Sequence, residues 1–223
     1  MVISATTSGF THRHLMNPKP NQDSIFAYED EEIKIGVVCD GCGEIPMSHV
    51  GSALVAKCFG KTLMDDSKSM FALEELFERA YNAVMGMLLE LSLDYIPKEW
   101  FLTTIVAAVI RDNICYSICW GDGHVETWRK NGSGGVINGH RSVVPNYPLR
   151  DTPETFEPEV IDNIDRVIIG SDGLLDLKKV CSFEYFEDLY NLKSSVQLQR
   201  KLNLFNYRKP MQLPDDTTLV IMK

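Results

Sequence analysis

Residues 35–43 read IGVVCDGCG, an apolar run that ends abruptly in Asp40 and Gly41. The β-branched side chains of this run predict a buried strand. A carboxylate at the end of a rigid strand, beside glycines that let the backbone bend close to it, suits a cation better than a hydrophobic core. Residues 167–173, VIIGSDG, repeat the pattern around Asp172. The question for the rest of the chain is whether these two strand ends meet in space.

Composition limits the class of protein. The chain has 223 residues, of which 44% are hydrophobic and 24% charged, as is typical of a globular protein with one sizeable core. No linker rich in Pro, Gly and Ser divides the chain, so we predict a single domain over residues 1–223. A formal charge of -9 argues against binding to nucleic acid or to an anionic membrane, because both need basic patches.

Signals for export and for membrane insertion are missing from the sequence. The first residues lack the basic and apolar pattern of a secretory signal, and the longest apolar run, residues 105–110, is too short to cross a bilayer. We therefore expect a cytoplasmic protein whose six cysteines stay reduced. Cys39 and Cys42 form a C-x-x-C pair, but no second pair follows at the spacing of a zinc site, so we interpret both as structural.

Hydrophobic periodicity predicts an α+β fold with antiparallel strands, because the predicted helices follow one another instead of alternating with strands as βαβ units. Strands are expected at residues 2–10, 23–28, 33–39, 103–110, 114–120, 125–129, 166–170 and 217–222. Helices are expected at residues 48–63, at 70–93 and, in outline, at 183–204. Residues 131–164 are rich in loop-forming residues.

Acidic residues recur at the ends of the predicted strands. They are Asp23, Asp40, Asp122, Asp172 and the pair Asp215-Asp216. Any single Asp-Gly is most often only a turn. A cluster of five such positions would select hard cations, Mg²⁺ or Mn²⁺, and two such ions bridged by a carboxylate would hold a hydroxide for attack on a phosphoryl group. Whether the positions converge depends on the fold.

Six short motifs follow one another along essentially the whole chain. They are NQDS at 21–24, VCDGCG at 38–43, TT at 103–104, GDG at 121–123, GSDGLLD at 170–176 and DDTTLVI at 215–221. Each motif is weak alone, but the ordered series resembles the metal-dependent protein phosphatases, protein phosphatase type 2C, in a compact bacterial-style form. The resemblance implies two packed antiparallel β-sheets flanked by helix pairs, a four-layer αββα sandwich. It also implies hydrolysis of phosphoserine and phosphothreonine in proteins by a metal-bridging hydroxide.

The resemblance assigns two Mg²⁺ or Mn²⁺ ions to the acidic positions. Asp40 would bridge both ions, and the carbonyl of Gly41 would bind the second. Asp172 and Asp215 would complete the shell of the first ion, so these two and Asp40 are the expected catalytic residues. Asp23 would ligate the second ion or orient its water.

The remaining positions are expected to play smaller parts. Asp122 would help to hold a third, weaker ion. Asp216, Ser171 and Thr104 are expected to support the ligands. His124 is interpreted as a strand-edge residue.

The sequence departs from the family pattern at three places. Pro18 stands where many members have an Arg that binds the substrate phosphate, and we expect His12 or Arg13 to take that role, although His12 packing or capping the first loop is an equal alternative. Cys42 stands where eukaryotic-type members have a His that protonates the leaving group, and Gln22 replaces a frequent Glu. Other candidates for the phosphate are His14 and Lys19.

The resemblance leaves three functions open. The first is a phosphatase whose partners are phosphorylated proteins, namely a Ser/Thr kinase or the targets of one. The second, favoured by the departures above, is a weakly active or inactive phosphoprotein-binding regulatory module on the same fold. The third is a phosphatase for small phosphorylated metabolites.

Overall fold

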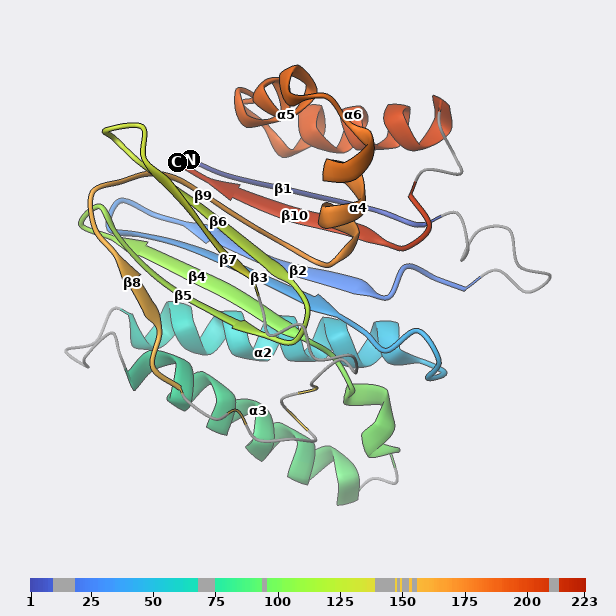
Figure 1. The fold of residues 1–223 in the computed structure, drawn as a ribbon. Coiled ribbons are helices and arrows are strands. Elements are labelled where there is room, and N and C mark those ends of the chain that lie inside the picture. Colours follow the sequence, from blue (N-terminus) through green and yellow to red (C-terminus); the bar gives the residue numbers. More distant parts are fainter. Residues whose placement is uncertain are drawn as a thin grey trace.

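Two antiparallel sheets pack face to face and helices cover their outer faces (Figure 1). The computed structural model describes residues 1–9, 19–67, 75–93, 96–138, 147, 149, 153, 156–208 and 213–223. Sheet A contains, in spatial order, β1 (Val2–Thr7), β10 (Thr217–Met222), β9 (Ile164–Gly170), β6 (His124–Arg129) and β7 (Gly134–Asn138). Sheet B contains β2 (Asp23–Glu29), β3 (Ile33–Asp40), β4 (Ile105–Arg111), β5 (Ile114–Trp120) and β8 (Glu159–Ile161).

Helices form the two outer layers. Sheet B is covered by α2 (Ser48–Asp66) and α3 (Leu76–Leu93), and the short 3-10 helix η2 (Lys98–Phe101) follows α3 in the chain. Sheet A is covered by α4 (Gly173–Val180), α5 (Phe183–Tyr190) and α6 (Ser195–Arg208). The four-layer α+β arrangement is confirmed, with three helices rather than two on sheet A. No helix in the described part of the chain is both long and apolar enough to cross a membrane.

Strand alternation produces three hydrophobic layers. In β3, Ile35 and Val37 pack under α2 and α3, whereas Val38 faces the other sheet. In β10, Leu219 packs under the helices of sheet A, whereas Val220 faces sheet B. Successive side chains of a strand point to opposite faces, so strands buried on both faces must be apolar at nearly every position. This explains why these strands appear in the sequence as continuous apolar runs.

Most of the predicted elements are confirmed, and the differences have local causes. The region 131–164 contains β7 and β8, which were missed because β7 begins with two glycines and β8 has three residues. The helical region 183–204 is two helices, α5 and α6, separated at residues 191–194. The short helix α4 was also missed, because its eight residues coincide with the GSDGLLD motif.

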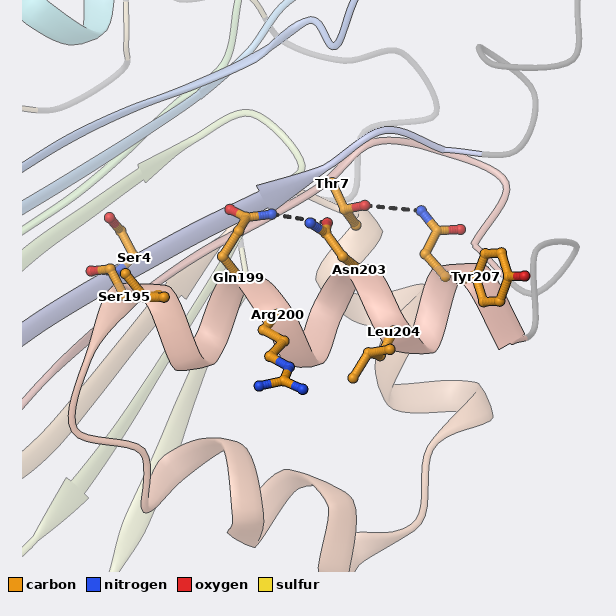
Figure 2. A pocket seen from close by; sticks show the side chains of 10 residues that line it. Ser4, Thr7, Ser195, Gln199, Arg200, Asn203, Leu204 and Tyr207 are labelled. Atoms are coloured by element: carbon orange, nitrogen blue, oxygen red, sulfur yellow. Dashed lines mark hydrogen bonds between the residues drawn. The ribbon is translucent and has the colours of Figure 1, made fainter.

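The free edge of sheet A is closed by α6. The outward backbone N–H groups of Ser4 and Thr6 in β1 donate to Ser195 Oγ (3.0 Å) and Gln199 Oε1 (3.1 Å), and Gln199 Nε2 donates to the carbonyl of Thr6 (2.5 Å). An open groove of about 820 Å³ runs beside these contacts, between α6 and β1 (Figure 2). Unpaired edges invite pairing with other chains, and side-chain bonds from α6 remove that opportunity here.

Connections that cross between the sheets deliver residues to one end of the sandwich. The turn at residues 121–123 carries the chain from β5 in sheet B to β6 in sheet A. Gly121 has a φ of 112°, a conformation that favours glycine. The turn leaves Asp122 between the sheets, near the ends of β3 and β9.

Candidate functional site

A cavity of about 130 Å³ lies where β3 and β9 end. Four of the predicted acidic residues line it: Asp40, Asp122, Asp172 and Asp215. Gly41 lines it as well. The two Asp-Gly strand ends therefore do meet in space, one from each sheet. The other lining residues are Gln22, Cys42, Gly43, Thr104 and Tyr147.

Asp23 lies directly behind Asp40. The two are opposite each other in the antiparallel pairing of β2 and β3. Asp23 is 6% exposed, and its Oδ2 accepts a hydrogen bond from Ser171 Oγ at 2.7 Å. It belongs to the same acidic group but not to the cavity wall, so its predicted place as a metal ligand or water-orienting group stays a prediction.

The backbone around Asp40 is held from the neighbouring chain segment. Its carbonyl accepts hydrogen bonds from Thr104 N (2.9 Å) and Thr103 Oγ1 (2.7 Å), and its own N–H donates to Thr104 Oγ1 at 3.2 Å. Gly41 forms an isolated β-bridge with Thr103, and its N–H donates to the Gln22 carbonyl at 3.2 Å. A Cβ on Gly41 would stand 2.9 Å from the carbonyl oxygen of Ser48. Glycine is required there because the backbones approach closely.

Asp172 is presented by the start of α4. It occupies the N-cap position, but its side chain makes no capping hydrogen bond. Its Oδ1 is buried and has no hydrogen-bond partner within the described residues. An Asp at an N-cap normally accepts a bond from its own helix. Here the carboxylate lines the cavity instead, so it is available to a ligand.

Asp216 and Ser171 connect the segments that surround the cavity. Asp216 accepts hydrogen bonds from Gly9 N on Oδ1 (2.8 Å) and from Gln22 N on Oδ2 (2.7 Å). Ser171 Oγ donates to Asp23, and it accepts a bond from Thr218 N at 3.1 Å. Both residues therefore lie beside the acidic group, and their predicted role in supporting metal ligands stays a prediction.

Crowding of carboxylates raises their pKa values. Burial raises the pKa of Asp40 well above 3.8, and the negative charges of Asp23, Asp172 and Asp215 raise it further. Burial, then Asp215 and Asp122, raise the pKa of Asp172 from 3.8 to about 7. The pKa of Asp122 is also raised, mainly by burial. Each ionised carboxylate disfavours ionisation of its neighbours, so a bound cation would stabilise the ionised form of the whole group.

The oxygen atoms around the cavity fit a hard cation. Of the buried oxygens that lack a hydrogen-bond partner within the described residues, three belong to this region: Gln22 Oε1, Asp23 Oδ1 and Asp172 Oδ1. No group of three His, Cys, Asp or Glu side chains in the described ranges could hold a metal ion by itself. Mg²⁺ keeps several waters and needs only one or two carboxylates. The donors therefore suit hydrated Mg²⁺ or Mn²⁺, and the individual ligand assignments stay predictions.

Two positions differ from their sequence interpretation. His124 is not a strand-edge residue but is 2% exposed, with Nε2 2.8 Å from Glu126 Oε1. Tyr147 was missed, although it lines the cavity and is 9% exposed. Burial and a hydrogen bond with Cys42 raise its pKa. The only sequence signal for it is an aromatic residue in a polar loop. His12 and Arg13, predicted for phosphate, lie outside the described residues, as do His14 and Pro18.

The two remaining departures from the family pattern lie at the cavity. Cys42 lines the cavity, while Cys39 is buried in the core under α2. Gln22 Nε2 donates to the carbonyl of Cys42 (3.3 Å) and to Ser48 Oγ. Because both of its amide hydrogens are used in this way, Gln22 presents its neutral oxygen to the site in place of a charged Glu.

The chain matches a known protein family along most of its length. The family model for protein phosphatase 2C matches residues 11–205. No curated protein sequence matches the chain.

Several solved structures share the fold. The catalytic domain of the serine/threonine protein phosphatase PstP, in complex with two manganese ions, has a TM-score of 0.68 and 17% identity, over 99% of this chain and 96% of that chain. Serine/threonine phosphatase Stp1 from Staphylococcus aureus has a TM-score of 0.64 and 15% identity, over 99% and 93%. RsbX in complex with magnesium has a TM-score of 0.62 and 15% identity, over 99% and 92%.

Proposed function

The chain belongs to the protein phosphatase 2C family, and we propose that it is a Mg²⁺- or Mn²⁺-dependent phosphatase acting on phosphoserine and phosphothreonine in proteins. The observation that carries this proposal is the meeting of four carboxylates on one small cavity. The raised pKa values of Asp40, Asp122 and Asp172 support it, because among the described residues no positive charge is seen to keep these acids ionised. The solved relatives PstP and RsbX carry manganese and magnesium, respectively.

The proposed metal site contains the residues predicted from the sequence: Asp23, Asp40, Gly41, Asp122, Asp172 and Asp215. Asp40, Asp172 and Asp215 form the proposed catalytic set for two ions, and Asp122 would help with a weaker third. When bound, such cations activate water as a nucleophile and neutralise the charge of the phosphoryl group. The chain's own part is to hold these carboxylates in place.

Supporting contacts give the site its rigidity. Thr103 and Thr104 hold the backbone of Asp40 on one side of the cavity. Asp216 ties Gly9 and Gln22 together on the other side. The attacking group and the phosphorus atom must be aligned closely. Holding the ligands in fixed positions can therefore lower the activation free energy of phosphoryl transfer substantially.

The size of the cavity favours a protein substrate over a small metabolite. Sites that enclose a whole small molecule usually have volumes of about 300–1,000 Å³. The cavity here, at about 130 Å³, has room for ions and a phosphoryl group. The remainder of the substrate must then stay outside, as the polypeptide carrying a phosphoserine does. We propose a phosphorylated protein as the partner, either a Ser/Thr kinase or a target of one.

Hydrolysis of a phosphothreonine peptide tests the proposal. Phosphate release is expected with Mn²⁺ and is expected to stop with EDTA or with Asp172→Asn. The matched control is Asp112→Asn, an exchange of the same kind in an exposed turn whose side chain is 85% exposed. Activity that survives both chelation and Asp172→Asn contradicts the proposal.

A regulatory phosphoprotein-binding module is the second candidate. It is favoured by Gln22 and Cys42 at the cavity and by the lack of a preformed group of metal ligands within the described residues. Isothermal titration with a phosphopeptide separates the two candidates. Tight binding without phosphate release, at saturating Mn²⁺, would support the module.

A further inference from the structure

A second cluster of ionisable side chains lies beneath α4, outside the cavity. Its centre is Glu126 of β6, whose side chain is 4% exposed. Glu126 Oε1 contacts both His124 Nε2 (2.8 Å) and Lys178 Nζ of α4, and Tyr190 of α5 donates its hydroxyl to Oε2 at 3.4 Å. We call these four residues the Glu126 cluster. A buried carboxylate held by partners on three elements fixes those elements relative to one another.

Helix α4 lacks the usual stabilisation at its own start. Asp172 is its N-cap residue and makes no capping bond, which forgoes about 1 kcal/mol of helix stability. An isolated helix of eight residues is not stable in water. The direction of α4 must therefore come from its attachments to the sheet.

Those attachments are the buried side chains of Leu174 and Leu177, which pack in the core under the helix, and polar or close contacts nearer its two ends. At the start, Gly173 lies so close to the backbone of Asp216 that a Cβ would collide with the Asp216 carbonyl oxygen. Toward the other end, Lys178 joins Glu126. At 1.5 Å per residue, Lys178 lies about 9 Å along the axis from Asp172. The close approach at Gly173 and the two buried leucines seat the start and middle of the helix on the sheet, and Lys178 adds a charged contact near its other end.

We propose that Glu126 and Lys178 are positioning residues that hold Asp172 in the cavity through α4, an inference that rests on the metal site proposed above. The cluster also connects Asp172 with Asp122. His124 is two residues after Asp122 and is opposite Gly170, two residues before Asp172, in the pairing of β6 and β9. One carboxylate therefore links the strand that follows Asp122 to the helix that follows Asp172.

Mn²⁺ binding by titration calorimetry on the metal-stripped full chain tests this. Lys178→Met and Glu126→Gln are expected to weaken Mn²⁺ binding about 10- to 100-fold, the range for residues that support a metal ligand. Lys178→Arg, which keeps the charge, is expected to restore most of the affinity. The matched control is Lys179→Met on the same helix, because Lys179 is 72% exposed and pairs only with Asp176 at 2.7 Å among the ion pairs described.

A second variant guards against simple unfolding. The double change Glu126→Gln with Lys178→Met removes both charges, so it leaves no uncompensated buried ion to destabilise the fold. It still loses the attachment of α4 and must still show weakened Mn²⁺ binding. Affinity within twofold of the Lys179→Met control in this folded variant would overturn the proposal.

A metal-free measurement separates this inference from the proposed function. Amide hydrogen exchange at Leu174 and Leu175, in the first turn of α4, is expected to be faster in Lys178→Met than in Lys179→Met without any metal. Unchanged exchange contradicts the positioning role even if the protein is an active phosphatase. Faster exchange and weaker Mn²⁺ binding support that role even if no phosphopeptide is hydrolysed.

Discussion

The molecule contains two buried clusters with acidic residues, and they differ in the charges that surround the carboxylates. In the Glu126 cluster, a single carboxylate is surrounded by partners from its own chain, Lys178, His124 and Tyr190. In the cavity, Asp40 and Asp172 are surrounded by further carboxylates, and their pKa values are raised. The two clusters are joined by the eight residues of α4.

The difference shows how a fold marks a place for a ligand. Burying a charge is costly unless a partner compensates it. The Glu126 cluster supplies that partner internally and so completes itself on folding. In the part of the chain that the structure describes, the cavity supplies no such partner, and Asp172 Oδ1 and Gln22 Oε1 lack a hydrogen-bond partner there. A buried acid with its own cation indicates structure, and a group of buried acids without one indicates a site for an external cation.

The largest expected effect is at the cavity. Asp40→Asn is expected to reduce Mn²⁺-dependent phosphate release by more than about 100-fold, the upper range for residues that merely support a ligand. The reason is that Asp40 stands between the acidic residues of both sheets. The rate of phosphate release from a phosphothreonine peptide measures it. A loss similar to that of the exposed Asp112→Asn would mean that the two clusters do not differ as described.

The next effect concerns the internally compensated cluster. Lys178→Met is expected to lower the free energy of unfolding by about 2 kcal/mol, less than the roughly 3–5 kcal/mol for a fully buried pair, because Lys178 is 33% exposed. In EDTA this loss reflects the broken ion pair alone, and bound metal should enlarge it because the variant binds Mn²⁺ more weakly. Urea denaturation of this variant and of Lys179→Met, each with and without EDTA, measures it. Equal stability of the two variants would contradict the interpretation.

The pH dependence of folding stability also distinguishes the two clusters. Burial and neighbouring acids raise the pKa of Asp23 and Asp172 from 3.8 to about 7 in the folded protein. Between these values the folded state holds more protons than the unfolded state, so stability falls as pH rises from about 4 to 7. In EDTA we expect each of these two carboxylates to contribute a loss of up to about 1.4 kcal/mol per pH unit in that window.

Bound Mn²⁺ should flatten this dependence, because the cation compensates the ionised carboxylates. Urea midpoints at pH 5, 6 and 7, with EDTA and with Mn²⁺, provide the measurement. Stability that rises with pH in EDTA would show that the cavity acids are compensated internally after all.

The smallest effect is expected from the neutral thiol at the cavity. Cys42→Ser should change phosphate release by less than about twofold, in line with substitutions that touch no charge or packing feature. The serine keeps a small polar group beside Tyr147. Steady-state rates at saturating Mn²⁺ test this, and a loss approaching that of Asp40→Asn would assign the thiol a direct part in the reaction.

Much of the fold was predictable because its signals are local. The strand ending at Asp40 and the strand ending at Gly170 are apolar runs stopped by Asp-Gly, and both were recognised from single segments. Short elements were not predicted, because they carry too little local pattern. The strand β8 has three residues and α4 has eight, so neither has a period long enough to detect.

Some residues of the candidate site were likewise predictable from local sequence, and others were not. The acidic residues were identifiable because each lies at or next to one end of a strand, beside a turn or loop. Tyr147 was not, because it reaches the cavity from a loop without periodicity. His124 was misread as a strand-edge residue because it contacts the buried Glu126, whose other partners, Lys178 and Tyr190, lie on helices more than fifty residues further along the chain.

Side-chain periodicity and turn chemistry along the chain were enough to predict the α+β class, most of the strands and the acidic residues at their ends. Tertiary structure alone decided that Asp40 and Asp172 face one cavity, that Asp216 ties backbone segments together and that Glu126 is compensated from within. The reason is physical. Whether a carboxylate is paired or left for a cation depends on which charges burial brings within a few ångströms, and those charges come from distant parts of the chain.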